Sequence, residues 1–197
     1  MSKVFHALAI VALVAGCGSR PSGNPNAPKF LDDACGILDE RRNFLPAFRK
    51  TQDRYGVPVA VIMSMIWQES KFKAEARTPN QYKLGVIPVG RQSSAYGYAQ
   101  ALDATWEEYQ KLTGNRRAKR DNINDAAEFM GWYMQQSNKE LGLAMNDTRN
   151  QYLAYHDGRS GFRRGTYKSK PWLVTIANKL EDRAIMYHLQ LEKCGKL

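Results

Sequence analysis

Three short segments of the sequence carry residue types that could handle a proton during bond cleavage: "QES" at 68–70, "SAYGYAQ" at 94–100 and "AYHDG" at 154–158. The first ends an almost wholly apolar run, "VPVAVIMSMIWQ", so we expect Glu69 to lie against apolar side chains. Burial disfavours the charged form of a carboxyl group and raises its pKa. Such an acid can stay protonated near neutral pH and donate its proton to a leaving group. The alternative is that Glu69 is an ordinary residue at a helix end.

The apolar run before Glu69 predicts a buried central helix. Gly56 ends the preceding helical pattern, and Pro58 suits the first turn of a new helix. The run that follows has almost no polar face, and a helix that is apolar all round is buried. We therefore expect this helix to be the core element of the domain, with Glu69 at its C-terminal end.

The rest of the chain also has the pattern of a helical protein. Apolar residues recur at helical spacing in the segments 39–55, 101–113, 122–141, 148–156 and 171–193. Residues 73–95 lack a period and contain two prolines and two glycines, which predicts a long loop. The alternation typical of strands does not persist anywhere. The sequence therefore predicts an all-α fold, with about six to seven helices around the buried central helix.

The order and spacing of the three segments resemble the lysozyme-like domain of the soluble-type lytic transglycosylases. That family has a Glu-Ser pair at the end of a buried helix, then Gly-x-x-Gln before a helix, then Ala-Tyr-Asn followed by Gly. The segment "GYAQALDATWEEY" continues the likeness, which covers roughly residues 50–190. The resemblance implies a lysozyme-like fold. It also implies a lyase that cleaves the β-1,4 bond after N-acetylmuramic acid in peptidoglycan and forms a 1,6-anhydro sugar.

The resemblance also implies roles for single residues. Glu69 would be the catalytic acid, which protonates the leaving oxygen and then takes a proton from the muramic acid 6-hydroxyl. Five further residues match positions at the substrate site: Ser70, Gly97, Tyr98, Gln100 and Tyr155. Ser70 would hold the N-acetyl or ring region, and Gly97 would let the backbone approach the sugar. Tyr98 would offer a stacking or hydrogen-bonding surface, Gln100 would line the site near the acid, and Tyr155 would orient the acid or the intermediate. Each of these residues also has an ordinary structural role open to it.

The third segment departs from the family pattern. His156 and Asp157 follow the tyrosine where the family has Asn, and the segment "HDGRSGFRRG" is longer and more basic than the usual loop. Asp157 could be a second carboxylate, which hydrolases use to activate water or to attack the sugar carbon. The alternative, which we favour, is that Asp157 caps a turn with Gly158. Basic residues of this loop could face the carboxylates of stem peptides: Arg159, Arg163, Arg164 and Lys168.

Residues 1–16 predict an exported protein. Lys3 precedes an apolar stretch that suits a secretory signal and is shorter than the about 20 residues that a membrane-spanning helix needs. The stretch ends in "VAGC", which resembles the bacterial lipoprotein signal, with Cys17 as the acylated first residue of the mature protein. The alternative is ordinary signal cleavage nearby with a free Cys17. Gly18, in place of Asp, favours outer-membrane sorting, so we expect a periplasmic, lipid-anchored protein.

The mature chain is expected to have a tether and one domain. Residues 17–29 are rich in Gly, Pro, Ser and Asn, which predicts a flexible tether. Residues 30–197 would form the lysozyme-like domain. Cys35 and Cys194 lie near its two ends, and disulfides persist in exported proteins. We expect a disulfide between them that closes a loop of about 160 residues; two buried free thiols are the alternative.

The composition narrows the classes of partner. The chain has 197 residues, enough for one domain, and a formal net charge of +10. Strong positive charge favours anionic partners, and for an exported lipoprotein these are acidic cell-wall polymer or anionic lipid rather than nucleic acid. Zinc-site spacing of Cys and His is absent, so we expect no metal or cofactor, and a monomer that binds peptidoglycan glycan strands. The competing hypotheses are a lysozyme-type hydrolase and a glycan-binding or envelope-assembly lipoprotein with little turnover.

Overall fold

The computed structural model describes residues 23–197 of the chain. The expected signal segment 1–16, Cys17 and the first part of the expected tether lie outside the described residues. Within the described part there are seven α-helices, a short 3-10 helix and a two-stranded sheet. The all-α fold class is therefore confirmed.

Helix α3, Val59–Ser70, is the centre of the domain. Every residue from Val59 to Ile66 is buried, and helices α2, α5, α6 and α7 all contact this helix. Pro58 precedes it with a φ of −59°, which suits a helix start. The expected central helix is thus present, and Glu69 occupies its last turn.

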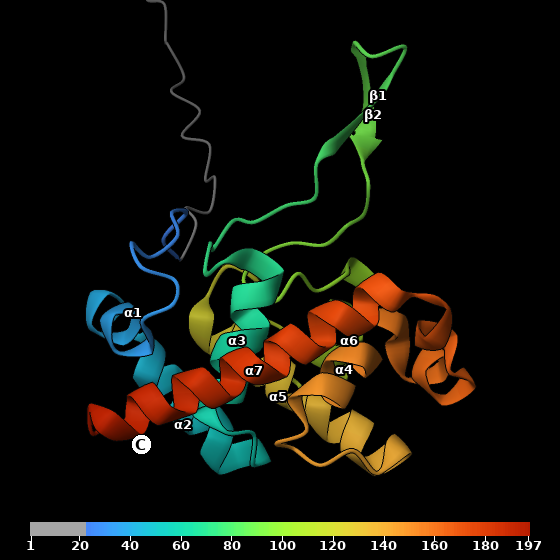
Figure 1. Cartoon of the computed structure of the whole chain (residues 1–197). Helices are drawn as coiled ribbons and strands as arrows, with labels where there is room; N and C mark the ends of the chain where they lie inside the picture. Colours follow the sequence, from blue (N-terminus) through green and yellow to red (C-terminus); the bar gives the residue numbers. More distant parts are fainter. Residues whose placement is uncertain (1–22) are drawn as a thin grey trace, which may run out of the picture.

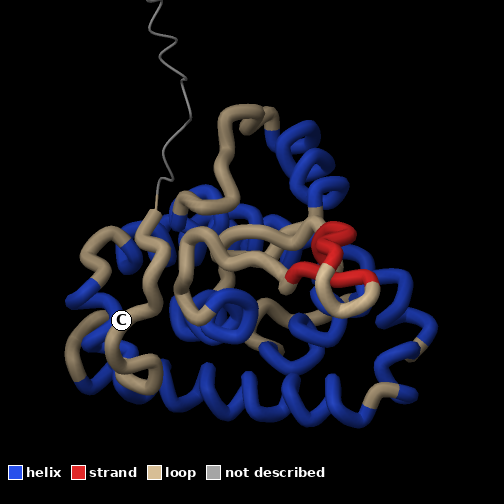
Figure 2. Tube along the Cα trace, turned by 90° about the horizontal axis from the view of Figure 1, so that it is seen from above, coloured by secondary structure: helices blue, strands red, loops and turns tan. Residues whose placement is uncertain are grey.

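The other helices surround α3 (Figure 1). Seen from above, helices form most of the rim of the molecule and loops cross its middle (Figure 2). The bounds of the surrounding helices are α1 Ala34–Glu40, α2 Phe44–Tyr55, α4 Asp103–Thr113, α5 Ile123–Leu141, α6 Thr148–Arg164, the 3-10 helix η1 Thr166–Ser169 and α7 Pro171–Lys193.

Two helix predictions need correction. The segment 39–55 was expected to form one helix, but α1 ends at Glu40 and α2 begins at Phe44. Helix α6 was expected to end near residue 156, with a basic loop after it. The helix continues to Arg164 beyond a kink at Gly158, whose φ of +72° and ψ of 154° break the helical path. Glycine can adopt this conformation without a steric penalty, so the chain bends there and resumes its helix.

The segment 73–95 contains a β-hairpin that the sequence pattern did not predict. Strand β1, Asn80–Lys83, pairs antiparallel with strand β2, Ile87–Arg91. All residues of both strands are exposed. A strand that buries neither face has no reason to alternate apolar and polar residues, so the usual strand signal is missing. The hairpin stands clear of the helices (Figure 1).

The two ends of the described chain are fixed to the domain. The predicted disulfide is present and joins Cys35 in α1 to Cys194, the residue that caps α7. Two residues near the end of the expected tether, Asn24 and Lys29, form hydrogen bonds with the domain. The Asn24 carbonyl accepts a hydrogen bond of 2.9 Å from the Ala74 amide, and the Lys29 amide donates to Glu40 at 2.9 Å.

Among residues 23–197, no helix combines the length and the apolar character that crossing a membrane would require.

Candidate active site

Glu69 lies where the chain leaves the central helix. Helix α3 ends at Ser70, and the next two residues both have positive φ, 53° at Lys71 and 59° at Phe72. Left-handed conformations are uncommon for residues other than glycine and cluster at functional sites. The Phe72 side chain is fully buried, and its burial pins this sharp turn. The turn therefore holds Glu69 at a fixed position at the edge of the core.

The surroundings of Glu69 favour its neutral form. Its side chain is only partly exposed, and burial raises its pKa from 4.5 to about 8, although the positive charge of Lys71 acts in the opposite direction. The pKa of Lys71 is itself lowered to about 8, first by burial and then by the charge of Arg183. Glu69 can therefore carry a proton at neutral pH, as the sequence led us to expect.

Trp67 lies between two cations beside Glu69. The Lys71 Nζ is 3.1 Å from the centre of the Trp67 ring, and the Arg183 Cζ is 3.5 Å from it. Two groups this close to one ring centre must lie on opposite faces. Arg183 is held in place by an ion pair of 2.7 Å with Asp32. Sequence reasoning missed both cations. Lys71 gave a signal, since it follows Glu69 by two residues, but Arg183 is more than a hundred residues away.

Gln100 braces the turn in which it lies. Its Nε2 donates hydrogen bonds to the Ala76 carbonyl at 2.8 Å and to the Gly97 carbonyl at 2.9 Å. Gln100 has a φ of 48°, so this turn too contains a residue in the left-handed region. Because Ala76 belongs to the segment that leaves α3, the amide of Gln100 ties the second sequence segment to the first.

Two residues that were expected to contact sugar, Gly97 and Tyr98, have close partners within the fold. Gly97 has a φ of +81°, and a Cβ there would lie 2.1 Å from the Arg120 carbonyl oxygen. The close approach that requires glycine is thus to the protein's own backbone. The Tyr98 side chain is 1% exposed and meets Phe44 edge to face, at 5.7 Å between ring centres. It is a core aromatic and has no surface to offer a ligand.

Ser70 has a local partner. Its side chain is buried, and its hydroxyl donates a 3.1 Å hydrogen bond to the Ile66 carbonyl, one turn earlier in α3. The structure therefore gives Ser70 a role within the helix end rather than at an open surface.

Tyr155 connects the third segment to the other two. Its hydroxyl donates a hydrogen bond to the Ala99 carbonyl, next to Gln100. Burial raises its pKa well above the ordinary value, and the negative charge of Glu69 raises it further. Glu69 acts in the same way on Tyr152, one helical turn before Tyr155 in α6. All three sequence segments therefore meet around Tyr155.

An open pocket of about 290 Å³ lies beside this meeting point. Tyr155 is the residue that belongs both to the pocket and to the surroundings of Glu69. The pocket is lined mainly by aromatic and small polar residues, which are Gln100, Ala101, Leu102, Thr105, Phe129, Tyr133, Tyr155, His156, Asp157 and Gly158. A larger hollow of about 700 Å³ lies near Tyr96 and α4, but Glu69, Gln100 and Tyr155 do not line it.

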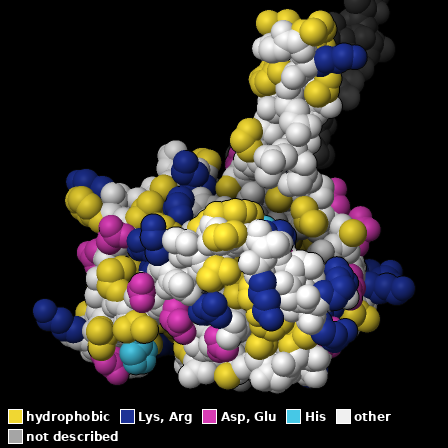
Figure 3. Space-filling view, turned by 45° about the vertical axis from the view of Figure 1, so that its right-hand side comes forward, with side chains coloured by type: hydrophobic (Ala, Val, Ile, Leu, Met, Phe, Trp, Pro, Cys, Tyr) yellow, Lys and Arg dark blue, Asp and Glu magenta, His cyan; other side chains and the backbone are white. Residues whose placement is uncertain are grey.

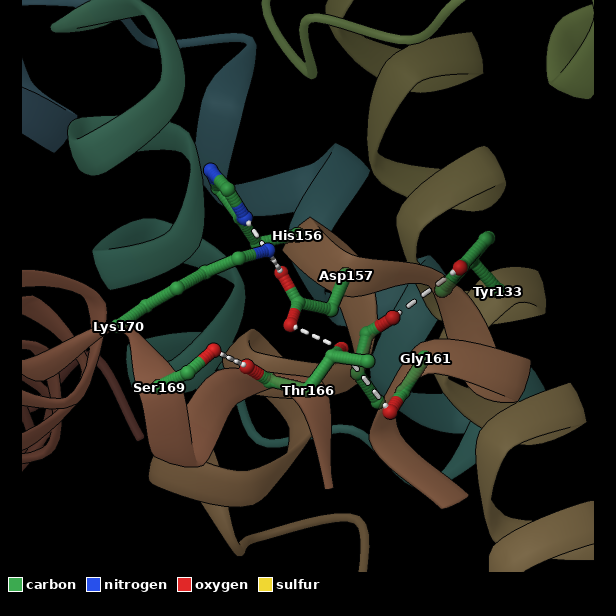
Figure 4. Close-up of polar contacts among 8 residues, drawn as sticks. Tyr133, His156, Asp157, Gly161, Thr166, Ser169 and Lys170 are labelled. Carbon is green, nitrogen blue, oxygen red and sulfur yellow. Dashed lines mark hydrogen bonds and ion pairs between the residues drawn. The ribbon is translucent and has the colours of Figure 1, made fainter. Parts of the chain in front are cut away.

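Asp157 is a buried carboxylate that is already bound (Figure 4). Its side chain is 1% exposed and accepts hydrogen bonds from Lys170 Nζ at 2.6 Å and Thr166 Oγ1 at 2.7 Å. The His156 Nδ1 lies 3.1 Å away. Burial by itself would raise the pKa of Asp157, but these hydrogen bonds outweigh it and lower the pKa. Asp157 therefore braces the kink at Gly158 against η1 and the start of α7.

The basic residues after Asp157 are only partly free. Arg159 and Arg163 both pair with Glu140, at 2.7 and 3.7 Å. Arg164 and Lys168 line another open hollow at the end of α6. The expected basic loop is thus a helical surface. Within residues 23–197, no group of three or more His, Cys, Asp or Glu side chains is placed to hold a metal ion.

Comparison with known protein families gives one match. A family model described as "Transglycosylase SLT domain" matches residues 5–194. No curated protein matches the chain. The matched stretch contains the end of α3, the turn at Gln100 and the part of α6 that carries Tyr155.

Proposed function

The chain belongs to the transglycosylase SLT domain family, and from this premise we propose that it is a peptidoglycan lytic transglycosylase. Its substrate would be the glycan strand, cut at the β-1,4 bond between N-acetylmuramic acid and N-acetylglucosamine. Its product would carry a 1,6-anhydro ring on the muramic acid. Glu69 would serve first as the general acid and then as the general base.

The observation that carries this proposal is the position of Glu69 in the last turn of the buried helix α3. Burial raises the pKa of its carboxyl group to about 8. When ionised, this group raises the pKa of Tyr155, and Tyr155 is one of the residues that line the nearby pocket. A general acid works best when its pKa lies near the working pH, because it is then protonated and can still give up its proton. Environment-raised carboxyl pKa values are the pattern of glycosidase acids.

The proton balance of the proposed reaction needs one carboxyl group. Glu69 gives its proton to the bridging oxygen as the bond from that oxygen to C1 of the muramic acid breaks. The sugar is left as an oxocarbenium-like species. The Glu69 carboxylate then removes the proton of the 6-hydroxyl on the same sugar, and that oxygen bonds to C1. Glu69 ends protonated again, and no water is consumed.

The state of Asp157 favours this route over hydrolysis. A hydrolase needs a second carboxylate that is free to activate water or to attack C1. The acceptor oxygens of Asp157 are occupied by Lys170 and Thr166, and its side chain is almost fully buried. A carboxylate in this condition is poorly suited to either task.

We also propose that the protein is attached to a membrane. Cys17 would be acylated after removal of residues 1–16, and the domain would face the periplasm from the outer membrane. The support is the sequence alone: a lysine, a short apolar stretch and "VAGC". The disulfide between Cys35 and Cys194 fits an oxidising compartment of this kind.

The test is product analysis on purified peptidoglycan with wild-type protein and Glu69→Gln in parallel. The expected result is release of fragments with a 1,6-anhydro ring by the wild type, identified by mass, and no release by the variant. Circular dichroism and the intact disulfide would verify that the variant is folded. Release of reducing sugars would indicate a hydrolase. Undiminished release by Glu69→Gln would remove Glu69 from the chemistry, and glycan binding without release by the wild type would favour a binding lipoprotein.

A further inference from the structure

The β1–β2 hairpin presents apolar side chains to solvent. Leu84 is 83% exposed, Val86 75% and Val89 56%. Tyr82 and Ile87 on the same hairpin are also about half exposed. Figure 3 shows the hairpin standing out from the domain with hydrophobic side chains along it and at its end. Contiguous apolar surface on a soluble domain marks a place where something else binds.

Leu84 is an unusual residue for its position. It has a φ of 54° and is followed by Gly85 with a φ of +75°, and the Val86 amide donates to the Lys83 carbonyl to close the turn. Tight hairpin turns with two positive φ values normally use Asn-Gly or Asp-Gly. Leu84 has a strained backbone conformation and a largely exposed side chain, and asparagine would suit both conditions better. The apolar side chain at the tip is therefore explained by a contact with another molecule rather than by packing within the domain.

All charged side chains on the arm formed by residues 76–102 are basic. Residues 76–102 contain Arg77, Lys83 and Arg91 but no Asp or Glu. Lys83 directly precedes the apolar tip, whereas Arg77 and Arg91 lie nearer the base of the arm. Apolar side chains combined with basic ones on a single segment are the composition of segments that lie in the interface of anionic membranes. Neutral sugar rings would not require this combination of aliphatic and basic side chains.

The N-terminal segment enters the domain at the base of this arm. The Ala74 amide donates to the Asn24 carbonyl, and Ala74 lies three residues before Arg77, which bridges to Tyr96 where the arm begins. The six residue-to-residue steps from Cys17 to Gly23 can span about 20 Å when extended. The seven residue-to-residue steps from Arg77 to Leu84 span about 23 Å as a strand. An anchor at Cys17 and the hairpin tip can thus reach the same plane.

We propose that the tip of the hairpin, Leu84–Val89, inserts into the interface of the anionic phospholipid membrane that holds the Cys17 anchor. This inference rests on the proposed acylation of Cys17 and is independent of catalysis. Two attachment points fix the orientation of a domain, whereas a single flexible anchor leaves it free to rotate. The arm extends from the segment between Glu69 and Gln100, so its insertion would set how far the active site stands from the membrane.

The test places a fluorescent label at the tip of the full-length, acylated protein. Leu84→Cys would be labelled with an environment-sensitive nitrobenzoxadiazole group, and the protein reconstituted into vesicles of phosphatidylglycerol and phosphatidylethanolamine. The matched control is Leu112→Cys on α4, where the native leucine is 65% exposed. The expected result is a blue shift at position 84, quenched by spin-labelled lipid, and no shift at position 112. Neutral phosphatidylcholine vesicles should give a smaller shift.

A second measurement uses the cleavage site at Lys83. Trypsin should cut after Lys83 in detergent, and vesicles should protect the bond in the wild type. Leu84→Asn combined with Val86→Ser should lose this protection, because asparagine suits the turn but neither side chain enters lipid. The same shift and protection are expected in Glu69→Gln, which separates this inference from the proposed activity. Three results would overturn the proposal. The label at position 84 could stay in water, or its shift could be caused by glycan fragments or a protein partner instead of vesicles. The third is a Cys17 that carries no acyl groups.

Discussion

The Tyr155 hydroxyl donates its hydrogen bond to the Ala99 carbonyl, and this bond joins helix α6 to the turn that carries Gln100. The Tyr155 ring also packs on Tyr133, at 5.0 Å between ring centres. When Glu69 is ionised, its charge raises the pKa of the same hydroxyl. Tyr155 therefore couples the position of the turn to the surroundings of the acid, and it does so from the wall of the adjacent pocket.

Tyr155→Phe should weaken both stability and turnover. The ring packing stays, but the Ala99 carbonyl loses its partner, which costs about 1 kcal/mol of unfolding free energy. We expect kcat on peptidoglycan to fall about tenfold, corresponding to about 1.4 kcal/mol of transition-state free energy. Urea titration and fragment release measure the two effects. An unchanged kcat in a variant that has lost stability would show that the bond serves the fold alone.

The pH dependence of cleavage should have a basic limb near pH 8. Glu69 must be protonated to act as an acid, and its pKa is about 8, so kcat/KM falls as the pH rises through that value. Lys71 titrates in the same range, so the basic limb reports the coupled titration of Glu69 and Lys71. Lys71→Met removes the positive charge that lowers the pKa of Glu69, and the limb should move to higher pH.

Lys71→Arg is the matched control for this experiment. It keeps a positive charge beside Glu69, so its basic limb should remain near that of the wild type. A limb that does not move in Lys71→Met, or that falls near pH 4.5 in the wild type, would contradict the assignment of the buried acid.

Protein stability should also report the burial of Glu69. Its pKa is 4.5 when unperturbed and about 8 in the folded chain, so the folded state holds this proton more tightly than the unfolded state. The contribution is fully present below pH 4.5 and is lost as the pH rises to about 8. At about 1.4 kcal/mol per pKa unit, the loss is at most about 5 kcal/mol. Glu69→Gln does not titrate, so its melting temperature relative to wild type should rise between pH 4.5 and 8. A constant difference would contradict the raised pKa.

The parts of the structure that the sequence predicted well depend on local patterns. The central helix follows from an apolar run with Pro58 at its start, and the disulfide from two cysteines in an exported chain. Glu69 and Tyr155 were singled out through the order of their motifs, and their catalytic roles stay predictions; ionised Glu69 raises the pKa of Tyr155.

The features that the sequence did not predict depend on residues that are distant in sequence, or belong to an element that packs on no core. The burial of Tyr98 depends on Phe44 and Asn24, which no spacing rule brings near. The partner of Asp157, Lys170, lies thirteen residues further along, beyond a helix that was expected to be a loop. The hairpin buries neither face, so it has no periodic pattern to detect.

Gly97→Ala should be one of the most damaging small substitutions in the domain. Its φ is +81°, and the added Cβ would lie 2.1 Å from the Arg120 carbonyl oxygen. The turn with Gln100 would have to shift, with an expected loss of about 2–4 kcal/mol of unfolding free energy. Gly114→Ala is the matched control, since its φ is +73° with no atom within 4 Å of the added Cβ. That variant should lose only about 1 kcal/mol. Equal losses would mean that the backbone angle, and not the contact with Arg120, is what requires glycine.

Asp157→Asn should separate a bracing carboxylate from a catalytic one. The substitution keeps the shape of the side chain but removes the charge that binds Lys170 at 2.6 Å. Because the Asp157 side chain is almost fully buried, we expect a loss of about 2–3 kcal/mol of unfolding free energy. Glu140→Gln breaks the 2.7 Å pair with Arg159, but Glu140 is 41% exposed. That control should cost less than about 1 kcal/mol.

The products of Asp157→Asn decide between the two chemistries. If Glu69 alone moves the proton in both steps, folded Asp157→Asn protein should still release fragments that carry the 1,6-anhydro ring. Slower turnover would then follow from a looser kink at Gly158 and would track the loss of stability. If Asp157 activates water or attacks C1, the wild type should yield reducing sugars, and the substitution should abolish them even at temperatures where the variant remains folded. Mass analysis of the fragments at two temperatures distinguishes these results, because a change in product type cannot come from lost stability alone.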